Sequence, residues 1–96
     1  MRAMPQKFRY QFEELKHNHI TFEYGPDDDE VLQVTTAGGT PMISLNRSGM
    51  LALAKFLIKM GLGPYSDGFH VHLYSDFDAG KPECLIVGLV DKEPGK

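Results

Sequence analysis

Residues Asn46 to Gly61 read NRSGMLALAKFLIKMG, and the architecture of the chain follows from this segment. Its apolar residues recur at intervals of three and four, which is the spacing of one face of an α-helix. Asn46 is a favoured N-cap residue, because its side chain accepts hydrogen bonds from the free backbone N–H groups of the first turn. Gly61 and Gly63, with Pro64 after them, end the pattern. The sequence therefore predicts one helix over residues 47–61, approximately.

The predicted helix is apolar over more than half of its circumference. Only Ala52, Lys55 and Lys59 form a polar strip along it. One face of a sheet would cover less than the remaining apolar surface. We therefore expect the helix to lie in a curved sheet, to be covered by a terminal segment, or to offer part of its surface to another chain.

Segments on both sides of the helix carry patterns that are typical of β-strands. Most of them alternate apolar with polar residues, and the last, Glu83 to Val90, is a nearly continuous apolar run that predicts burial on both faces. Gly38-Gly39 predicts a tight hairpin turn, because two consecutive positive φ angles cost little only at glycine. The strands expected from these patterns are residues 7–13, 19–24, 30–37, 40–45, 69–74 and 83–90. The sequence thus predicts an α+β domain in which a five- to six-stranded, mostly antiparallel sheet carries the helix on one face.

Length and composition limit the classes of protein to consider. The 96 residues fit a single domain, 1–96, with frayed ends at about residues 1–6 and 91–96. No apolar stretch is long enough to span a bilayer, and no apolar leader follows Met1, so we expect a cytoplasmic protein without a membrane partner. The net charge is −3 and no basic stripe is present, which argues against nucleic-acid binding.

Two segments are candidates for a partner-binding surface. In Phe69–Tyr74, large apolar residues alternate with histidine or tyrosine, so the pattern predicts three ring side chains in a row on the outer face of a strand. The acidic run from Asp27 to Glu30 is either a solvated turn or a patch that binds a basic partner. The candidate partner-binding residues are His70, His72, Tyr74, Asp27, Asp28, Asp29 and Glu30.

Metal binding is an alternative interpretation of the histidines. In a strand, residues i and i+2 point to the same face, so two His-x-His pairs could converge on one ion. No third ligand follows at a fixed spacing, and we expect no metal and no other cofactor. The alternative site would consist of His17, His19, His70 and His72.

Catalytic motifs are not evident, and no catalytic residue is predicted. The segment Asp76–Gly80 is similar to the start of a calcium loop, but its third acid is absent and Val87 stands at the twelfth position, where such loops carry glutamate. No serine lies in a glycine elbow, and Cys84 lies within an apolar run. A catalytic pairing of His70 or His72 with Asp76 or Asp78 is an enzymatic alternative.

Three segments together carry a resemblance to a known family. They are Ile43–Ala54, Gly68–Leu73 and Glu83–Val87. These segments resemble the immunity proteins of bacterial polymorphic toxin systems, in particular the immunity protein thirty-two family. In that family an L-x-N-x-x-G-L segment opens a helix, a G-x-H-I-H-L strand follows, and a strand led by glutamate closes the domain.

The resemblance covers about residues 43–90 and implies a function in binding. An immunity protein is a cytoplasmic protein that occupies and blocks a cognate toxin, and the family offers no catalytic residues to transfer. The residues that match its motif are Asn46, Gly49, His70 and His72. The chain departs from the family in its longer aromatic N-terminal region and at Cys84 and Gly88.

The sequence therefore supports three hypotheses about function. The first is a protein-binding module that neutralises a toxin. The second is a metal-binding domain or metal-dependent enzyme that uses the paired histidines. The third is a structural domain that forms a homodimer through its helix or an edge strand.

Overall fold

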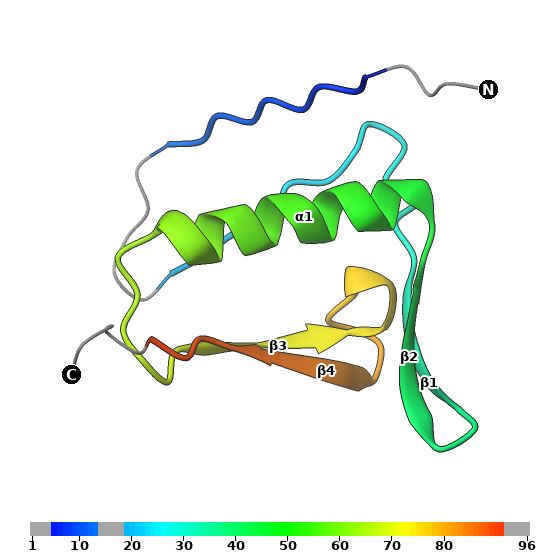
Figure 1. The fold of residues 1–96 in the computed structure, drawn as a ribbon. Coiled ribbons are helices and arrows are strands. Elements are labelled where there is room, and N and C mark those ends of the chain that lie inside the picture. The colour runs from blue at the N-terminus through cyan, green and yellow to red at the C-terminus, as the bar shows by residue number, and fades with distance from the viewer. Residues whose placement is uncertain (1–4, 14–18, 92–96) are drawn as a thin grey trace.

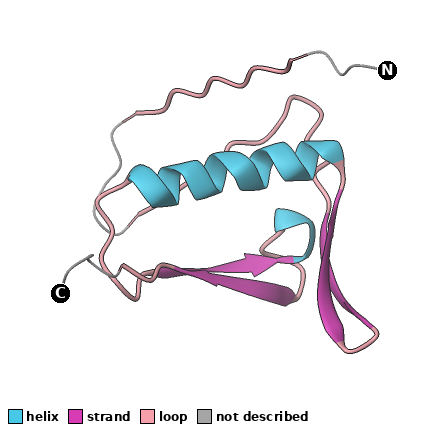
Figure 2. Ribbon diagram, viewed as in Figure 1, coloured by secondary structure: helices cyan, strands magenta, loops and turns pink. Residues whose placement is uncertain are grey.

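The computed structural model describes residues 5–13 and 19–91 of the chain. Its helix α1 runs above the hairpin of β3 and β4, and the hairpin of β1 and β2 stands at the N-terminal end of the helix (Figure 1). Residues 5–13 and 19–31 run as loops (Figure 2). The elements in chain order are β1 (Leu32–Ala37), β2 (Thr40–Leu45), α1 (Arg47–Leu62), β3 (His70–Tyr74), the short 3₁₀ turn η1 (Ser75–Phe77) and β4 (Glu83–Gly88).

The helix forms where its sequence predicts it and is one residue longer at its C-terminal end. The Asn46 side chain accepts a hydrogen bond of 2.8 Å from the Gly49 backbone N–H, so the predicted N-cap is confirmed. At the other end, the Gly63 N–H donates to the Lys59 carbonyl oxygen at 2.8 Å. Both ends of α1 therefore have partners for part of their free backbone groups.

Two antiparallel hairpins flank the helix in sequence. Ala37 lies opposite Thr40, so Gly38 and Gly39 form a two-residue turn with φ angles of +59° and +85°, as their sequence predicts. Leu32 in β1 is fully buried. In the second hairpin, His70 lies opposite Gly88 and the loop of residues 75–82 connects the strands.

The predicted single sheet of five to six strands is not confirmed. In the described part of the chain, β1 pairs only with β2 and β3 only with β4, which gives two separate two-stranded sheets. Residues 7–13 and 19–24 form no strand. Their alternation still places Tyr10 beside both Phe8 and Phe12, at ring-centroid distances of 6.3 and 5.4 Å.

We call residues 19–24 the strap. Two of its backbone carbonyl groups accept hydrogen bonds from side chains, whereas in a sheet they would accept them from a neighbouring strand. The Tyr65 hydroxyl donates to the His19 carbonyl oxygen at 2.7 Å, and the Lys59 ammonium donates to the Thr21 carbonyl oxygen at 3.1 Å. These carbonyl groups are therefore satisfied without a neighbouring strand. The strap runs as a loop against the helix, where Phe22 stacks on Phe56 of α1 at 4.6 Å.

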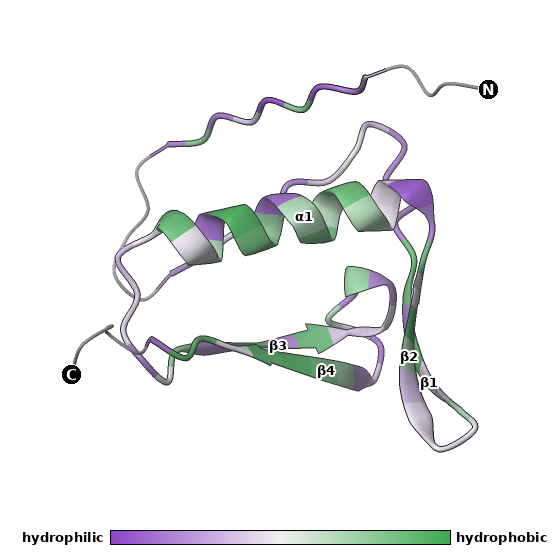
Figure 3. Cartoon of the chain, viewed as in Figure 1, coloured by the Kyte–Doolittle hydropathy of each residue, from purple (hydrophilic) through white to green (hydrophobic). Residues whose placement is uncertain are grey.

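The helix buries a different face from the one that its sequence predicts. The predicted polar strip is partly buried, because Lys59 finds polar partners in the strap and Ala52 is small. Figure 3 shows hydrophobic and hydrophilic residues interspersed along α1. The buried residues of α1 are Gly49, Ala52, Phe56, Lys59 and Met60, and its exposed large apolar residues are Met50, Leu51, Leu57 and Leu62.

A terminal segment runs beside the outer surface of the helix, but the large apolar residues Met50, Leu51, Leu57 and Leu62 stay exposed. Residues 5–13 run along α1 on the side away from β3 and β4 (Figure 1). The Lys55 ammonium lies 5.8 Å from the centroid of the Tyr10 ring.

The predicted burial of both faces of the last strand is wrong. Ile86 in β4 is 52% exposed, because a two-stranded sheet has no further layer on its outer face. The predicted frayed ends fall mostly on residues 1–4 and 92–96, which lie outside the described residues. No helix in the described ranges has the length and apolar character needed to cross a membrane.

Candidate functional site

Two acidic segments that are distant in the sequence meet around one open pocket of about 560 Å³. We call it the acidic pocket. One side is the turn that contains Asp28–Glu30, and the other is the loop Asp76–Lys81 that follows β3. The charged residues that line the pocket are five acids and one base, namely Asp28, Asp29, Glu30, Asp76, Asp78 and Lys81.

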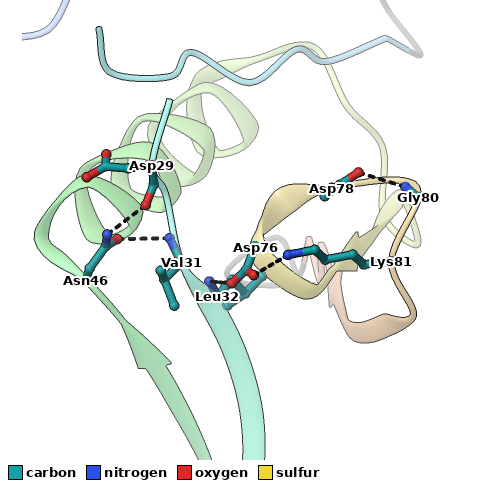
Figure 4. Close-up of polar contacts among 8 residues, drawn as sticks. All are labelled: Asp29, Val31, Leu32, Asn46, Asp76, Asp78, Gly80 and Lys81. Carbon is teal, nitrogen blue, oxygen red and sulfur yellow. Dashed lines mark hydrogen bonds and ion pairs between the residues drawn. The ribbon is translucent and has the colours of Figure 1, made fainter. Parts of the chain in front are cut away.

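Polar contacts fix the loop side of the pocket (Figure 4). Asp76 accepts a hydrogen bond of 3.1 Å from the Leu32 backbone N–H at the start of β1 and pairs with the Lys81 ammonium at 2.7 Å. The hydrogen bond from Lys81 holds the pKa of Asp76 below its ordinary value, with a further contribution from Leu32. Asp78 accepts from the Gly80 N–H at 2.9 Å. The loop is thus held against β1.

Asn46 fixes the opposite side of the pocket. Its Nδ2 donates to the Asp29 carbonyl oxygen at 2.8 Å, and its Oδ1 accepts from the Val31 N–H at 2.9 Å (Figure 4). The same Oδ1 caps α1 through Gly49. A Cβ atom on Gly49 would lie 2.3 Å from the Val31 carbonyl oxygen, so the close approach of helix and acidic turn requires glycine.

Glu30 is the buried carboxylate of this pocket. The residue is only 5% exposed, so Glu30 does not belong to a solvated turn, which is one of the two interpretations of the acidic run. Its Oε2 accepts from the Gly25 N–H at 2.5 Å, whereas its buried Oε1 has no hydrogen-bond partner in the described part of the chain. A buried polar atom without a partner costs free energy, and the cost is larger for a charged group. A donor that reaches Oε1 would remove this cost.

Aromatic rings form one wall of the pocket. Tyr24 and Phe77 both line it and meet edge to face at 6.3 Å. Phe22 lies 5.5 Å from Phe77 and stacks on Phe56, which connects the wall to the buried face of α1. Burial raises the pKa of the Tyr24 hydroxyl, and the nearby carboxylates, Glu30 first, raise it further. The negative charges around the pocket therefore add to the effect of burial on the pKa of Tyr24.

Backbone strain is concentrated at the same place. Among residues 5–13 and 19–91, the non-glycine residues with positive φ are Asp28, Asp76 and Phe77, at +51°, +56° and +57°. All three line the acidic pocket. Aspartate tolerates this conformation better than most residues, but phenylalanine rarely adopts it. Strain of this kind tends to occur at functional sites, where the surrounding structure maintains it.

Only part of the predicted acidic run thus lines the pocket, and residues from another segment complete the lining. Asp28, Asp29 and Glu30 line the pocket, while Asp27 is exposed and is not part of its lining. Sequence reasoning missed the contribution of the loop Asp76–Lys81 to this surface. The alternating acids of that loop are the available signal, but by themselves they do not indicate a contact with the distant acidic turn.

The two histidines of β3 are exposed as the alternation predicts, whereas Tyr74 follows an irregularity in the strand pairing between Leu73 and Tyr74. His70 and His72 are exposed and Tyr74 is half-buried, whereas Leu73 on the opposite face is 2% exposed. Phe69 and Val71 on that face are half-buried. The His72 Nδ1 lies 2.6 Å from Glu83 Oε1 of β4, and the rings of His70 and His72 lie 5.1 Å apart. This row is a second exposed surface.

The four histidines of the metal alternative are not brought together by the described residues. His17 lies outside them, and the contact described for His19 is through its backbone carbonyl. In the ranges 5–13 and 19–91, no group of three or more His, Cys, Asp or Glu side chains is arranged to hold a metal ion.

The acidic pocket therefore unites charge, a buried carboxylate with a free acceptor, a fixed aromatic wall and strained backbone. It is the strongest candidate site in the described part of the chain. No protein-family model, curated protein or solved structure matches the chain, so the geometry of this pocket and its chemistry carry the functional argument.

Proposed function

We propose that the protein is a binding module that uses the surface around the acidic pocket to bind a basic protein. The proposed partner is a toxin that the module neutralises by occlusion, as the resemblance to immunity proteins implies. The observation that carries the proposal is the convergence of two distant acidic segments on one open pocket.

Electrostatics supports a basic partner. Five carboxylates face one ammonium group around the pocket, and that ammonium is already paired with Asp76. A surface with an excess of one charge accelerates association with a partner of opposite charge and disfavours partners of like charge. The exposed ring of Tyr24 adds a rigid contact of the kind that is enriched at interfaces.

The motif positions of the resemblance support the same surface. Asn46 and Gly49 match the family motif at the start of the helix, and in this protein they hold Asp29 and Val31 in the wall of the pocket. A motif that appears structural in the sequence thereby shapes the proposed binding surface.

The experiment uses the product of the adjacent gene as the candidate toxin. Co-expression with this protein should restore growth, and calorimetry should detect a complex whose affinity falls as salt increases. The variant Asp28→Asn/Asp78→Asn removes two charges from the pocket, and the Asp78 replacement keeps an oxygen for the Gly80 N–H. We expect it to weaken binding by about tenfold or more.

A matched control removes two charges at the other end of the β3–β4 hairpin. Asp67 and Asp91 lie there, where Asp67 accepts from the Asp91 N–H at 2.9 Å. The variant Asp67→Asn/Asp91→Asn has the same net charge as the pocket variant and should bind nearly as well as wild type. Equal losses in both variants would mean that only the total charge matters. Failure to restore growth and to form any complex would rule out neutralisation of that toxin.

The rings of β3 are tested in the same assay. Replacement of His72 and Tyr74 with alanine removes exposed or half-buried contact area at positions outside the lining of the acidic pocket. A loss larger than that of the pocket variant would move the interface to the outer face of β3.

A further inference from the structure

We infer that the acidic pocket binds the guanidinium group of one arginine side chain, with Glu30 as its central acceptor. The inference rests on the proposed function, because the arginine is supplied by the partner protein. It adds the chemical identity of the contact and names the residue that recognises it.

The first argument is the unused acceptor on Glu30. Its Oε1 is buried and lacks a partner within the described residues, and Glu30 itself lines the pocket. The other oxygen is already engaged by Gly25. A cationic donor from the pocket would give Oε1 its missing hydrogen bond and compensate the buried charge at the same time.

The second argument is the state of the surrounding carboxylates. Lys81 neutralises Asp76, but Asp28, Asp29 and Asp78 form no ion pair with another described residue. Guanidinium carries five N–H donors in one plane and can therefore contact Glu30 and a carboxylate of the rim together. An ammonium group would satisfy fewer acceptors in a fixed geometry.

The third argument is the shape of the site. A volume of about 560 Å³ far exceeds the size of a bare metal ion, and Tyr24 and Phe77 supply an aromatic wall. Guanidinium stacks on aromatic rings, and the methylene stem of arginine packs on apolar surface. Pocket size, carboxylates and rings thus favour arginine over a metal ion.

The experiment is a titration of the ¹⁵N-labelled full-length protein with N-acetyl-arginine amide, monitored by NMR. The neutral isostere N-acetyl-citrulline amide is titrated in parallel. We expect the arginine probe to shift saturably the amide signals of residues 24–31 and 76–81, with little effect from citrulline. Equal shifts from both probes, or shifts elsewhere in the chain, would overturn the inference.

Three variants locate the interaction. Glu30→Gln keeps the size of the side chain and an oxygen for the Gly25 N–H, and should weaken the arginine probe by about tenfold or more. Asp27→Asn removes the same charge from the same turn outside the pocket lining, and should bind within about twofold of wild type. If Glu30→Gln does not fold, Asp28→Asn replaces it, since asparagine tolerates the positive φ of that position. Wild-type affinity in the pocket variant would contradict the assignment.

Calcium chloride is the third probe. Saturable binding of Ca²⁺ at the same amides, with displacement of the arginine probe by calcium at a lower concentration, would overturn the choice of ligand and identify a metal site. A toxin complex that forms normally with Glu30→Gln, in the absence of arginine binding, would reject this inference alone. Arginine binding without any toxin complex would reject the toxin as the partner but would still support an arginine site in the acidic pocket.

Discussion

The Lys59 ammonium lies 2.6 Å from the Glu23 carboxylate, although Lys59 belongs to the buried face of α1. The lysine side chain is 4% exposed and the glutamate side chain is 41% exposed. The Tyr10 hydroxyl also donates to Glu23, and burial and this hydrogen bond raise the pKa of Tyr10. One carboxylate therefore connects the N-terminal segment, the strap and the helix.

Neutralising Glu23 should lower the stability of the protein more than neutralising Lys59. Glu23→Gln leaves a buried ammonium without its counter-charge and should lower the free energy of unfolding by about 1–3 kcal/mol. Lys59→Met leaves a carboxylate that can turn to solvent and should cost less than about 1 kcal/mol. Urea denaturation measures both. The double variant should be more stable than Glu23→Gln alone, and the opposite order would show that Lys59 does not depend on Glu23.

Acid should destabilise the protein through Glu23 and Asp76. Hydrogen bonds from Lys59 and then Tyr10 lower the pKa of Glu23 from its ordinary value of 4.5, and Lys81 lowers that of Asp76 from 3.8. A depressed pKa contributes stability that is fully present above the ordinary value and is lost as pH falls through the value in the folded protein. Denaturation midpoints measured between about pH 6 and pH 2 should therefore fall with acid.

The matched variants for this pH dependence are Glu23→Gln and Asp76→Asn. Each removes one titrating carboxylate, so each should flatten the acid limb of the stability curve relative to wild type. An unchanged slope in both would show that other groups control the loss of stability in acid.

Replacement with alanine should change the stability of the protein in opposite directions at two glycines of α1. Gly49→Ala places its Cβ 2.3 Å from the Val31 carbonyl oxygen and should destabilise the protein by about 1–3 kcal/mol. Gly61→Ala meets nothing within 4 Å and should stabilise it by about 0.5–1 kcal/mol. Thermal denaturation compares the two. A neutral Gly49→Ala would mean that the acidic turn can move away from α1 at little cost.

A change of one functional group at Asn46 separates its role as the cap of α1 from its role in holding the acidic turn. Asn46→Asp keeps an acceptor for the Gly49 N–H and should preserve the cap, but it removes the donor to the Asp29 carbonyl oxygen. We expect a helix content close to wild type by circular dichroism, together with altered NMR shifts in residues 28–31. An unaltered acidic turn would show that Asn46 does not hold it.

Local sequence patterns predicted most of the regular structure. The helix, its cap at Asn46 and the Gly38-Gly39 turn depend on neighbouring residues, and all three were predicted. The alternation in residues 7–13 and 19–24 predicts two further strands, which are not confirmed, because both segments run as loops. Pairing depends on which partner takes each carbonyl group, and in the strap Lys59 and Tyr65 are those partners.

The acidic pocket was only half predictable for a related reason. The run Asp27–Glu30 is visible in the sequence, but its partner loop is brought to it by the contact of Asp76 with Leu32. No periodic pattern encodes a contact between residues so distant in sequence. The burial of Glu30 was equally hidden, because a fourth acid in an acidic run normally indicates solvent exposure.

The three hydrogen bonds of Asn46 couple two events that would otherwise be independent. Fraying of the first turn of α1 and opening of the wall at Asp29–Val31 both require the release of the same amide group. A ligand that holds the wall closed must therefore also hold the helix start closed. The backbone amide of Gly49 then becomes a remote reporter, whose rate of hydrogen exchange slows when the pocket is occupied.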